Sequence, residues 1–340
     1  MSSIEMITPA GAPRDVNPSE AYSLFGMKIS TLNKLGILVF VIVALIVPLV
    51  VESYTIFQFT RAGILAIAIV GLNLLTGING QFSLGHSAFF ALGAYVTAIM
   101  IDQWEVAYIG TLVVSGVICF IAGFLFGLPA LRLEGLYLAL ATFALAIATP
   151  QLLKYDLFEH WTGGVQGLDV FPPDWLDGDL NLYYFVFVML MIAFATSYCL
   201  VHSRTGRAMI ALRDNPLSAQ TMGVNAPLYK SVTFGVSALF TGVAGSLDAI
   251  AIQYVAPDSF TFALAISLLV GLVIGGMGSI PGALFGGIFI LFIPNLAEEV
   301  SKGLSWAVYG AFLILAVYVM PTGSAGLMRM AIGRFKKRIE

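Results

Sequence analysis

Apolar stretches of about 20 residues alternate with short polar segments along most of the chain, and a helix of that length crosses a bilayer. The pattern predicts ten membrane-spanning segments, at 34–51, 56–75, 82–101, 106–129, 135–153, 181–202, 231–254, 262–277, 282–297 and 304–321. The two short segments within 262–297 flank the glycine-rich stretch GGMGSIPG (275–282). They could instead form a broken or re-entrant pair, which leaves eight full spans.

Composition agrees with this pattern. The 340 residues are 59% hydrophobic and only 10% charged, whereas a soluble domain carries roughly 25% charged residues. The sequence therefore predicts an all-α polytopic membrane protein. Cys119 and Cys199 both lie in apolar stretches and suggest neither a disulfide framework nor a metal site.

The distribution of positive charge predicts the orientation. With the N-terminus in the cytoplasm, the inner segments hold 13 of the 16 lysines and arginines, as expected from the bias of positive charge to the cytoplasmic face. We therefore expect both termini to be cytoplasmic, with an N-terminal tail at 1–30, a transmembrane domain at 31–323 and a basic tail at 324–340.

The inner loop 203–230 contains its own helix start and stop signals. Asn215 can cap the N-terminus of a short helix, Pro216 suits its first position, and Gly223 suits the residue just past its end. These residues predict a helix of about two turns from Pro216 to Met222. A short rigid helix in a basic inner loop suggests a docking surface for a partner.

The outer loop 154–180 is long and acidic. It holds six acidic residues and the stretch WTGGVQGL (161–168). It could be an ordinary solvated loop or a docking site for an extracytoplasmic partner. The candidates for such docking are Trp161, Thr162, Gly163, Gly164 and Gln166.

The segment GLNLLTGINGQFSLGHSAFFALGAYVTA (71–98) interrupts a helical pattern with Gly77 and Gly80. Discontinuous helices often form the substrate region of transporters, but a short cytoplasmic turn followed by a capped helix would give the same pattern. Six polar residues are candidates for lining a translocation path: Asn73, Gln81, Ser83, His86, Thr142 and Asp248.

Asp248 is the only acidic residue well inside a predicted span. A carboxylate at that depth is costly and usually faces a cavity or a partner. Asp248 could serve a pathway, a proton relay or helix pairing, or it could reach water near the outer surface. Arg61, near the outer start of the second span, could pair with it or extend to the interface.

Three pairs of glycines have the spacing that allows close helix packing in membranes: Gly123/Gly127, Gly271/Gly275 and Gly282/Gly286. The chain has no GxxxxGK[ST] phosphate loop, no GxSxG and no HExxH motif. We therefore expect no catalytic site and no bound cofactor or metal in this chain.

Several stretches resemble the LivM-type permeases of branched-chain amino acid ABC importers. GLNLLTGINGQFSLGHSAFFALGAY (71–95) is similar to the signature of that family, and LPALRLEGLYLALATFALA (128–146) and TGGVQGL (162–168) are similar to its next motifs. The loop and span at 203–247 and the stretch GLVIGGMGSIPGALFGG (271–287) follow in the family's order.

This resemblance implies a type II ABC importer in a bacterial inner membrane. The implied partners are a second, LivH-type permease, two cytoplasmic ATPases of the LivG/LivF type that use ATP and Mg²⁺, and a periplasmic substrate-binding protein. No nucleic acid is implied. The helix in 203–230 would be the coupling helix, with the coupling residues Arg213, Asn215, Pro216, Leu217, Ala219, Thr221, Met222 and Gly223.

The resemblance leaves the contact with the ATPase, the cargo and the class of transporter open. The stretch Ala219–Gly223 lacks the acidic residue of the EAA pattern found in many ABC permeases, so no particular salt bridge to an ATPase is implied. The cargo could be a branched-chain amino acid, or urea, a short amide or an aromatic acid carried by a permease of the same family. A different class, an ion-coupled secondary transporter, would use Asp248.

Overall fold

The computed structural model describes residues 23–24, 27–28, 41–130, 133, 135–300, 305–319, 323–324 and 326. It divides into two compact units, one comprising 51–333 and the other 1–50 with 334–340. The predicted tails at 1–30 and 324–340 lie almost entirely outside the described residues. In the smaller unit, the described residues form a helix at Val41–Val50 and a short antiparallel pair, β1 (Ser23–Leu24) and β2 (Met27–Lys28).

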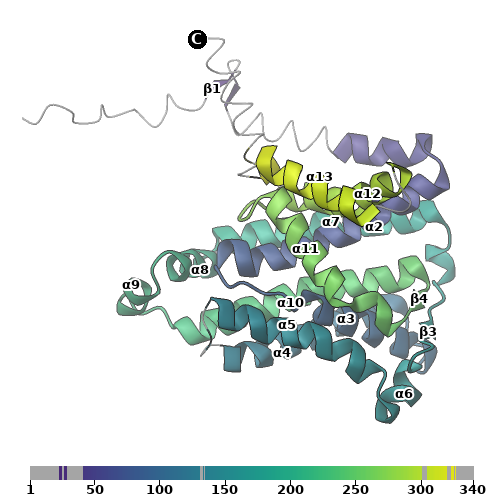
Figure 1. Cartoon of the computed structure of the whole chain (residues 1–340), viewed down its shortest axis with the longest axis horizontal. Helices are drawn as coiled ribbons and strands as arrows, with labels where there is room; N and C mark the ends of the chain where they lie inside the picture. Colours follow the sequence, from purple (N-terminus) through teal and green to yellow (C-terminus); the bar gives the residue numbers. More distant parts are fainter. Residues whose placement is uncertain are drawn as a thin grey trace, which may run out of the picture. The chain divides into compact units, whose positions relative to one another are not determined.

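The larger unit consists of helices with short connections (Figure 1). Its long helices are α2 (Ser53–Leu72), α3 (His86–Asp102), α4 (Tyr108–Ala130), α5 (Leu136–Leu153), α7 (Asp179–His202), α10 (Ala226–Ile252), α11 (Phe262–Gly275), α12 (Gly282–Val300) and α13 (Ser305–Val319). Its short elements are η2 (Asn73–Ile78), α6 (Asp156–Thr162), β3 (Leu168–Asp169), η3 (Asp174–Leu176), α8 (Arg204–Asp214), α9 (Pro216–Thr221), β4 (Tyr254–Val255) and η4 (Pro257–Phe260).

Six helices in the described residues are long and apolar enough to cross a membrane: α2 with η2, α4, α5, α7, α10 and α12. The helix at Val41–Val50, α3, α11 and α13 contribute shorter apolar segments. Together they confirm an all-α protein with several membrane-spanning helices. The 14 residues of α11 rise only about 21 Å, so this helix is too short to cross the bilayer as a straight, perpendicular span.

Helices α2 and α10 form the centre of the bundle. Their membrane segments are 94% and 78% buried within the chain, whereas those of α5 and α7 are only 22% buried. On α5, the buried residues repeat every fourth position, at Leu138, Thr142, Ala146 and Pro150. A helix buried along one stripe leaves most of its surface for lipid or another subunit.

The glycines allow very close contact between helices. Gly93 of α3 packs against the backbone of Gly242 in α10, and Gly245 packs against the backbone of Phe90. The three predicted glycine pairs pack in the same way, because Gly123 and Gly127 contact α10 while the two later pairs join α11 to α12. Small residues let backbones approach where lipid supplies no hydrophobic driving force between helices.

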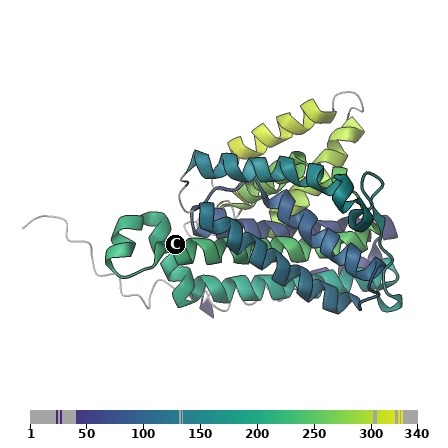
Figure 2. The ribbon, with the colours of Figure 1, turned by 90° about the horizontal axis from the view of Figure 1, so that it is seen from below.

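The two connecting regions that the sequence singled out lie at opposite ends of this unit. Figures 1 and 2 show α8 and α9 at one end of the helices and α6 at the other. At the α6 end, β3 pairs with β4, with Leu168 opposite Val255. The sequence analysis missed this pairing, because strands of two residues produce no alternating pattern and depend on contacts distant in sequence.

We predict that Gly245→Val destabilises the bundle, because a side chain there would meet the Phe90 backbone, which cannot move without shifting α3. Overpacking of this kind costs about 1–3 kcal/mol or more, which should lower the unfolding temperature of the detergent-solubilised protein by several degrees. Gly310→Val is the matched control, because nothing lies within 4 Å of the added atom. Equal unfolding temperatures for the two variants would contradict this packing argument.

Candidate functional site

A break in the helical backbone lies between α2 and α3. Helix α2 continues as the π-helix η2, residues 79–85 are not helical, and α3 begins at His86. The sequence predicts a span from Phe82, whereas the helix begins four residues later, at His86. Residues 82–85 are not helical, and hydrogen bonds from the Leu84 N–H to Thr142 and from the Gly85 N–H to Ser83 hold them in place. The discontinuity itself is confirmed.

Asn73 fixes the π-helix to a distant loop. Its carboxamide lies over Gly77, where any side chain would collide with it. Asn73 Oδ1 accepts a hydrogen bond from the Gly278 N–H at 2.7 Å, and its Nδ2 donates to the Ser279 carbonyl at 2.8 Å. Both partners lie in the loop between α11 and α12, so this candidate path residue holds two elements together.

A buried chain of hydrogen bonds through Ser83, His86 and Ser237, the relay, connects the break to α10. The Ser237 hydroxyl donates to the Gly71 carbonyl at 2.6 Å, so its oxygen must accept the proton of His86 Nε2, 2.7 Å away. The Ser83 hydroxyl lies 3.1 Å from Nδ1, so each ring nitrogen has a hydroxyl partner. His86 is 1% exposed, and with both nitrogens occupied it positions the break.

Thr142 connects the same segment to α5. Its hydroxyl donates to carbonyls of its own helix and accepts the Leu84 N–H at 2.9 Å. The structure thus brings together three of the six predicted path residues: Ser83, His86 and Thr142. The sequence analysis missed Ser237. Its small polar side chain in an apolar span was the available signal.

A cavity of about 360 Å³ lies beside this relay. Its lining comes from the break, from the start of α5 and from α11: Phe82, Ser83, Leu84, Gly135, Leu136, Ala139 and Leu269. The lining is almost wholly apolar and carries no charged side chain. Of the predicted path residues, Ser83 alone is among these lining residues.

The break also holds buried polar atoms without a hydrogen-bond partner among the described residues. They are both side-chain polar atoms of Asn79 and Nε2 of Gln81. Buried polar groups are nearly always paired, so each unpaired one calls for an explanation. Three further unpaired atoms lie in neighbouring helices, the hydroxyls of Ser87 and Tyr95 in α3 and of Ser231 in α10, so the break holds three of the six found in the described residues.

Asp248 forms an ion pair with Arg61. Arg61 Nε lies 3.3 Å from Asp248 Oδ1, and the two side chains are 31% and 8% exposed. This is one of the arrangements that the sequence left open. Asp248 lies about 16 Å along the axis of α10 from Ser237, so it is not part of the relay around His86.

Helix α9 matches the start and stop signals in its sequence. The Asn215 side chain accepts the Ser218 N–H at 3.0 Å, Pro216 is the first helical residue, and Gly223 has a φ of +84°. The helix ends at Thr221, one residue earlier than expected, because Met222 already leaves helical geometry. Leu217 and Met222 are 74% and 87% exposed.

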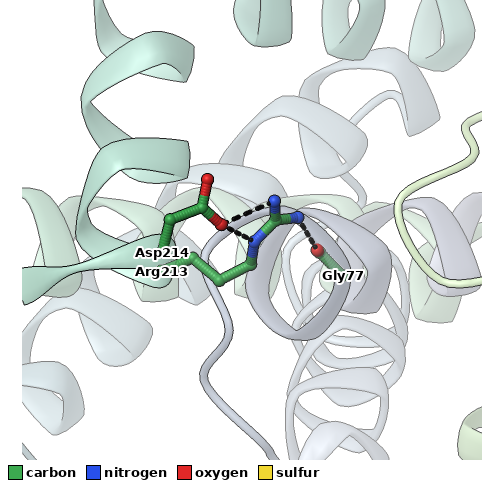
Figure 3. Close-up of polar contacts among 3 residues, drawn as sticks. All are labelled: Gly77, Arg213 and Asp214. Carbon is green, nitrogen blue, oxygen red and sulfur yellow. Dashed lines mark hydrogen bonds and ion pairs between the residues drawn. The ribbon is translucent and has the colours of Figure 1, made fainter. Parts of the chain in front are cut away.

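Arg213 reaches from the end of α8 to the helix break. Its Nη1 donates to the Gly77 carbonyl at 3.1 Å, while Nε and Nη2 hold the Asp214 carboxylate at 3.0 and 2.9 Å (Figure 3). The last residue but one of α8 is thereby connected to the end of η2.

The predicted docking residues of the outer loop fall into two groups. Thr162 is the last residue of α6, and Gly163 and Gly164 form the turn that follows; the Thr162 hydroxyl donates to the Leu153 and Phe158 carbonyls. Trp161 and Gln166 are exposed, and Trp161 packs edge-on against Trp104. These two leave side-chain surface available to a partner.

Comparison with known proteins identifies the family. A family model described as the permease component of branched-chain amino acid transport systems matches residues 54–317. The chain is 28% identical over 325 residues to the LivM permease protein of the high-affinity branched-chain amino acid transport system of Escherichia coli K12, covering 87% of this chain and 76% of that one.

Two further relatives cover more of their own length. The LivH permease protein of Salmonella typhimurium is 23% identical to this chain, and the BraD permease protein of Pseudomonas aeruginosa is 24% identical. Each alignment covers 77% of this chain and 91% of the relative. Comparison with solved structures gave no match. Because the family model covers most of the chain, this protein belongs to the permease components of branched-chain amino acid transport systems, which confirms the resemblance found in its sequence.

Proposed function

We propose that this chain is a transmembrane permease subunit of an ATP-driven importer and forms half of a path for branched-chain amino acids. The family match over 54–317 is the observation that carries this proposal. The test is uptake of radiolabelled leucine, isoleucine and valine by vesicles that contain the complete importer. Uptake should require ATP and should stop when this chain is omitted.

The partners follow from the same proposal. A LivH-type permease completes the path, two ATPases bind at the end that carries α8 and α9, and a periplasmic binding protein delivers the substrate at the α6 end. That orientation puts both termini in the cytoplasm of a bacterium and the chain in its inner membrane. ATP and Mg²⁺ act in the ATPases, and this chain binds no cofactor.

The cavity beside the break suits part of the path. Its apolar lining, with the Ser83 hydroxyl at one side, fits an amino acid whose side chain is a branched hydrocarbon. The unpaired polar atoms of Asn79 and Gln81 in the same segment could bind the charged groups of a zwitterion, as interrupted helices do in other transporters.

A permease for urea, a short amide or an aromatic acid would have the same fold, because substrate choice rests largely with the binding protein. Ligand binding by that protein separates these cargoes. The ion-coupled alternative rests on Asp248, whose pairing with Arg61 gives this carboxylate a structural role that requires no proton transfer.

Helix α9 is the proposed coupling helix. Leu217 on this helix and Met222, the residue that caps its C-terminus, are exposed large apolar side chains. They lie at the end of the bundle, where polar loops meet water. We predict that Leu217→Ser with Met222→Ser reduces co-purification of the ATPases at least about tenfold, since burying two such side chains is worth about 3 kcal/mol or more.

The matched control for this experiment is Val165→Ser with Phe171→Ser in the outer loop. This pair removes two exposed apolar side chains (67% and 75% exposed) from the opposite end. Its ATPase content should equal that of the wild type. Retention of the ATPases by the α9 variant would refute docking through these side chains.

The cap at Asn215 gives a second test of α9. Asn215→Ala removes the acceptor of the Ser218 N–H and should destabilise the short helix by about 1 kcal/mol, so uptake should fall several-fold. Asn215→Asp keeps the acceptor oxygen and should retain uptake. If the alanine and aspartate variants transport equally, the shape of this helix is not needed for coupling.

The ion-coupled alternative is tested at Asp248. Asp248→Asn leaves Arg61 without its counter-ion, so we expect less folded protein. The cost should be smaller than the about 3–5 kcal/mol of a fully buried pair, because Arg61 is 31% exposed. Adding Arg61→Gln removes both charges and should recover folded protein, with ATP-dependent uptake proportional to it. A well-folded double variant without uptake would favour the ion-coupled mechanism.

A further inference from the structure

We infer that Arg213 is the positioning residue through which movement of α9 reaches the helix break beside the cavity. The inference rests on the proposed function, because it concerns how ATPase docking becomes transport. It assigns to this one side chain a role distinct from docking, since its guanidinium binds the Gly77 carbonyl at the end of η2 while 39% of the side chain stays exposed (Figure 3).

The backbone carbonyls at the end of η2 need hydrogen-bond donors from outside that helix. The last carbonyls of any helix lack partners within that helix. The Leu74 and Leu75 carbonyls accept the N–H groups of Asn79 and Gln81. The Gly77 carbonyl accepts Arg213 Nη1 at 3.1 Å. Arg213 therefore caps the C-terminus of a membrane helix from a different segment of the chain.

Charge favours this contact. The C-terminal end of a helix carries partial negative charge, so a cation there is stabilising. A hydrogen bond from a charged donor is stronger than one between neutral groups. The planar guanidinium binds the Asp214 carboxylate through Nε and Nη2 and still directs Nη1 at Gly77. A lysine offers one nitrogen and cannot hold both partners in this fixed geometry.

Gly80 provides room for the arginine stem. Its φ is +75°, and a β-carbon there would lie 2.7 Å from Cγ of Arg213. The aliphatic part of Arg213 thus lies across Gly80 while the guanidinium reaches Gly77. The chain next enters the non-helical residues 82–84, which line the cavity.

The other end of the link is rigid. Arg213 stands two positions before Asn215, the N-cap of α9. Leu212, Ala219 and Ala226 form one buried cluster that packs α8, α9 and the start of α10 together. A displacement of α9 therefore carries Arg213 with it, and Arg213 pulls or releases the end of η2.

Arg207 supplies the comparison within the same helix. Its Nη1 donates to the carbonyl of His202, at the end of α7, so it does not reach the break. Arg207→Gln and Arg213→Gln each remove one positive charge from α8. The two variants differ in whether the cap on Gly77 is lost.

The experiment measures uptake per ATP hydrolysed by the complete importer in vesicles. Arg213→Gln should keep the ATPases bound and hydrolysing ATP, while uptake per ATP falls about tenfold or more, as expected for a lost charge-assisted hydrogen bond. Arg207→Gln should match the wild type. Arg213→Lys should lie between the two, and Gly80→Ala, which displaces the stem, should resemble Arg213→Gln.

Combining Gly80→Ala with Arg213→Gln should lower uptake per ATP no further than either change alone, because both changes break the same contact between Arg213 and Gly77. The inference is overturned if Arg213→Gln transports per ATP as Arg207→Gln does, or if it loses the ATPases. If Arg213→Gln does not fold, the Gly80→Ala variant decides: wild-type uptake per ATP in that variant also overturns the inference. If the wild-type complex itself shows no ATP-dependent uptake, the proposed function fails instead.

Discussion

The backbone between Gly77 and His86 is irregular in a membrane protein. The rest of the site depends on how the polar groups of this backbone are hydrogen-bonded. Hydrocarbon offers no hydrogen bonds, so non-helical backbone at membrane depth must be satisfied by protein or water. Here two backbone groups are bound from other helices: the Leu84 N–H donates to Thr142 on α5, and the Gly77 carbonyl accepts from Arg213 on α8. At the two edges of the break, the Asn73 side chain binds the loop between α11 and α12, and His86 is hydrogen-bonded to Ser237 on α10. The break is consequently the point where these elements meet.

Close packing of the central helices makes this arrangement possible. Gly93 and Gly245 bring α3 and α10 into backbone contact, which leaves short hydroxyl side chains within reach of carbonyls on neighbouring helices. Ser115 donates to the carbonyls of Gly93 and Gly242, and Thr97 donates to Ser246. Bulkier residues would separate the helices and leave these buried hydroxyls unpaired, at a cost of about 1–3 kcal/mol each.

Local signals in the sequence predicted much of this structure. The length of the apolar stretches predicted the long helices. Asn215–Pro216 and Gly223 predicted α9, and Gly77 with Gly80 predicted the break. What the sequence could not give depends on contacts distant in the chain. Ser237 is one serine among several on α10 until the fold brings it to His86. Arg213 resembled a docking charge because nothing local indicates that its guanidinium reaches a carbonyl 136 positions away in sequence.

The charges also limit what this chain can contribute to selectivity. Asp248 is paired with Arg61 away from the relay. In the relay, both nitrogens of His86 are hydrogen-bonded to serine hydroxyls, and the cavity lining carries no charged side chain. A fixed charge would reject or trap substrates by sign, and the described lining of this cavity carries none. In the importer proposed above, discrimination among small solutes with apolar bodies therefore belongs to the binding protein. The permease is then proposed to supply movement, for which the capped, glycine-flanked break is suited.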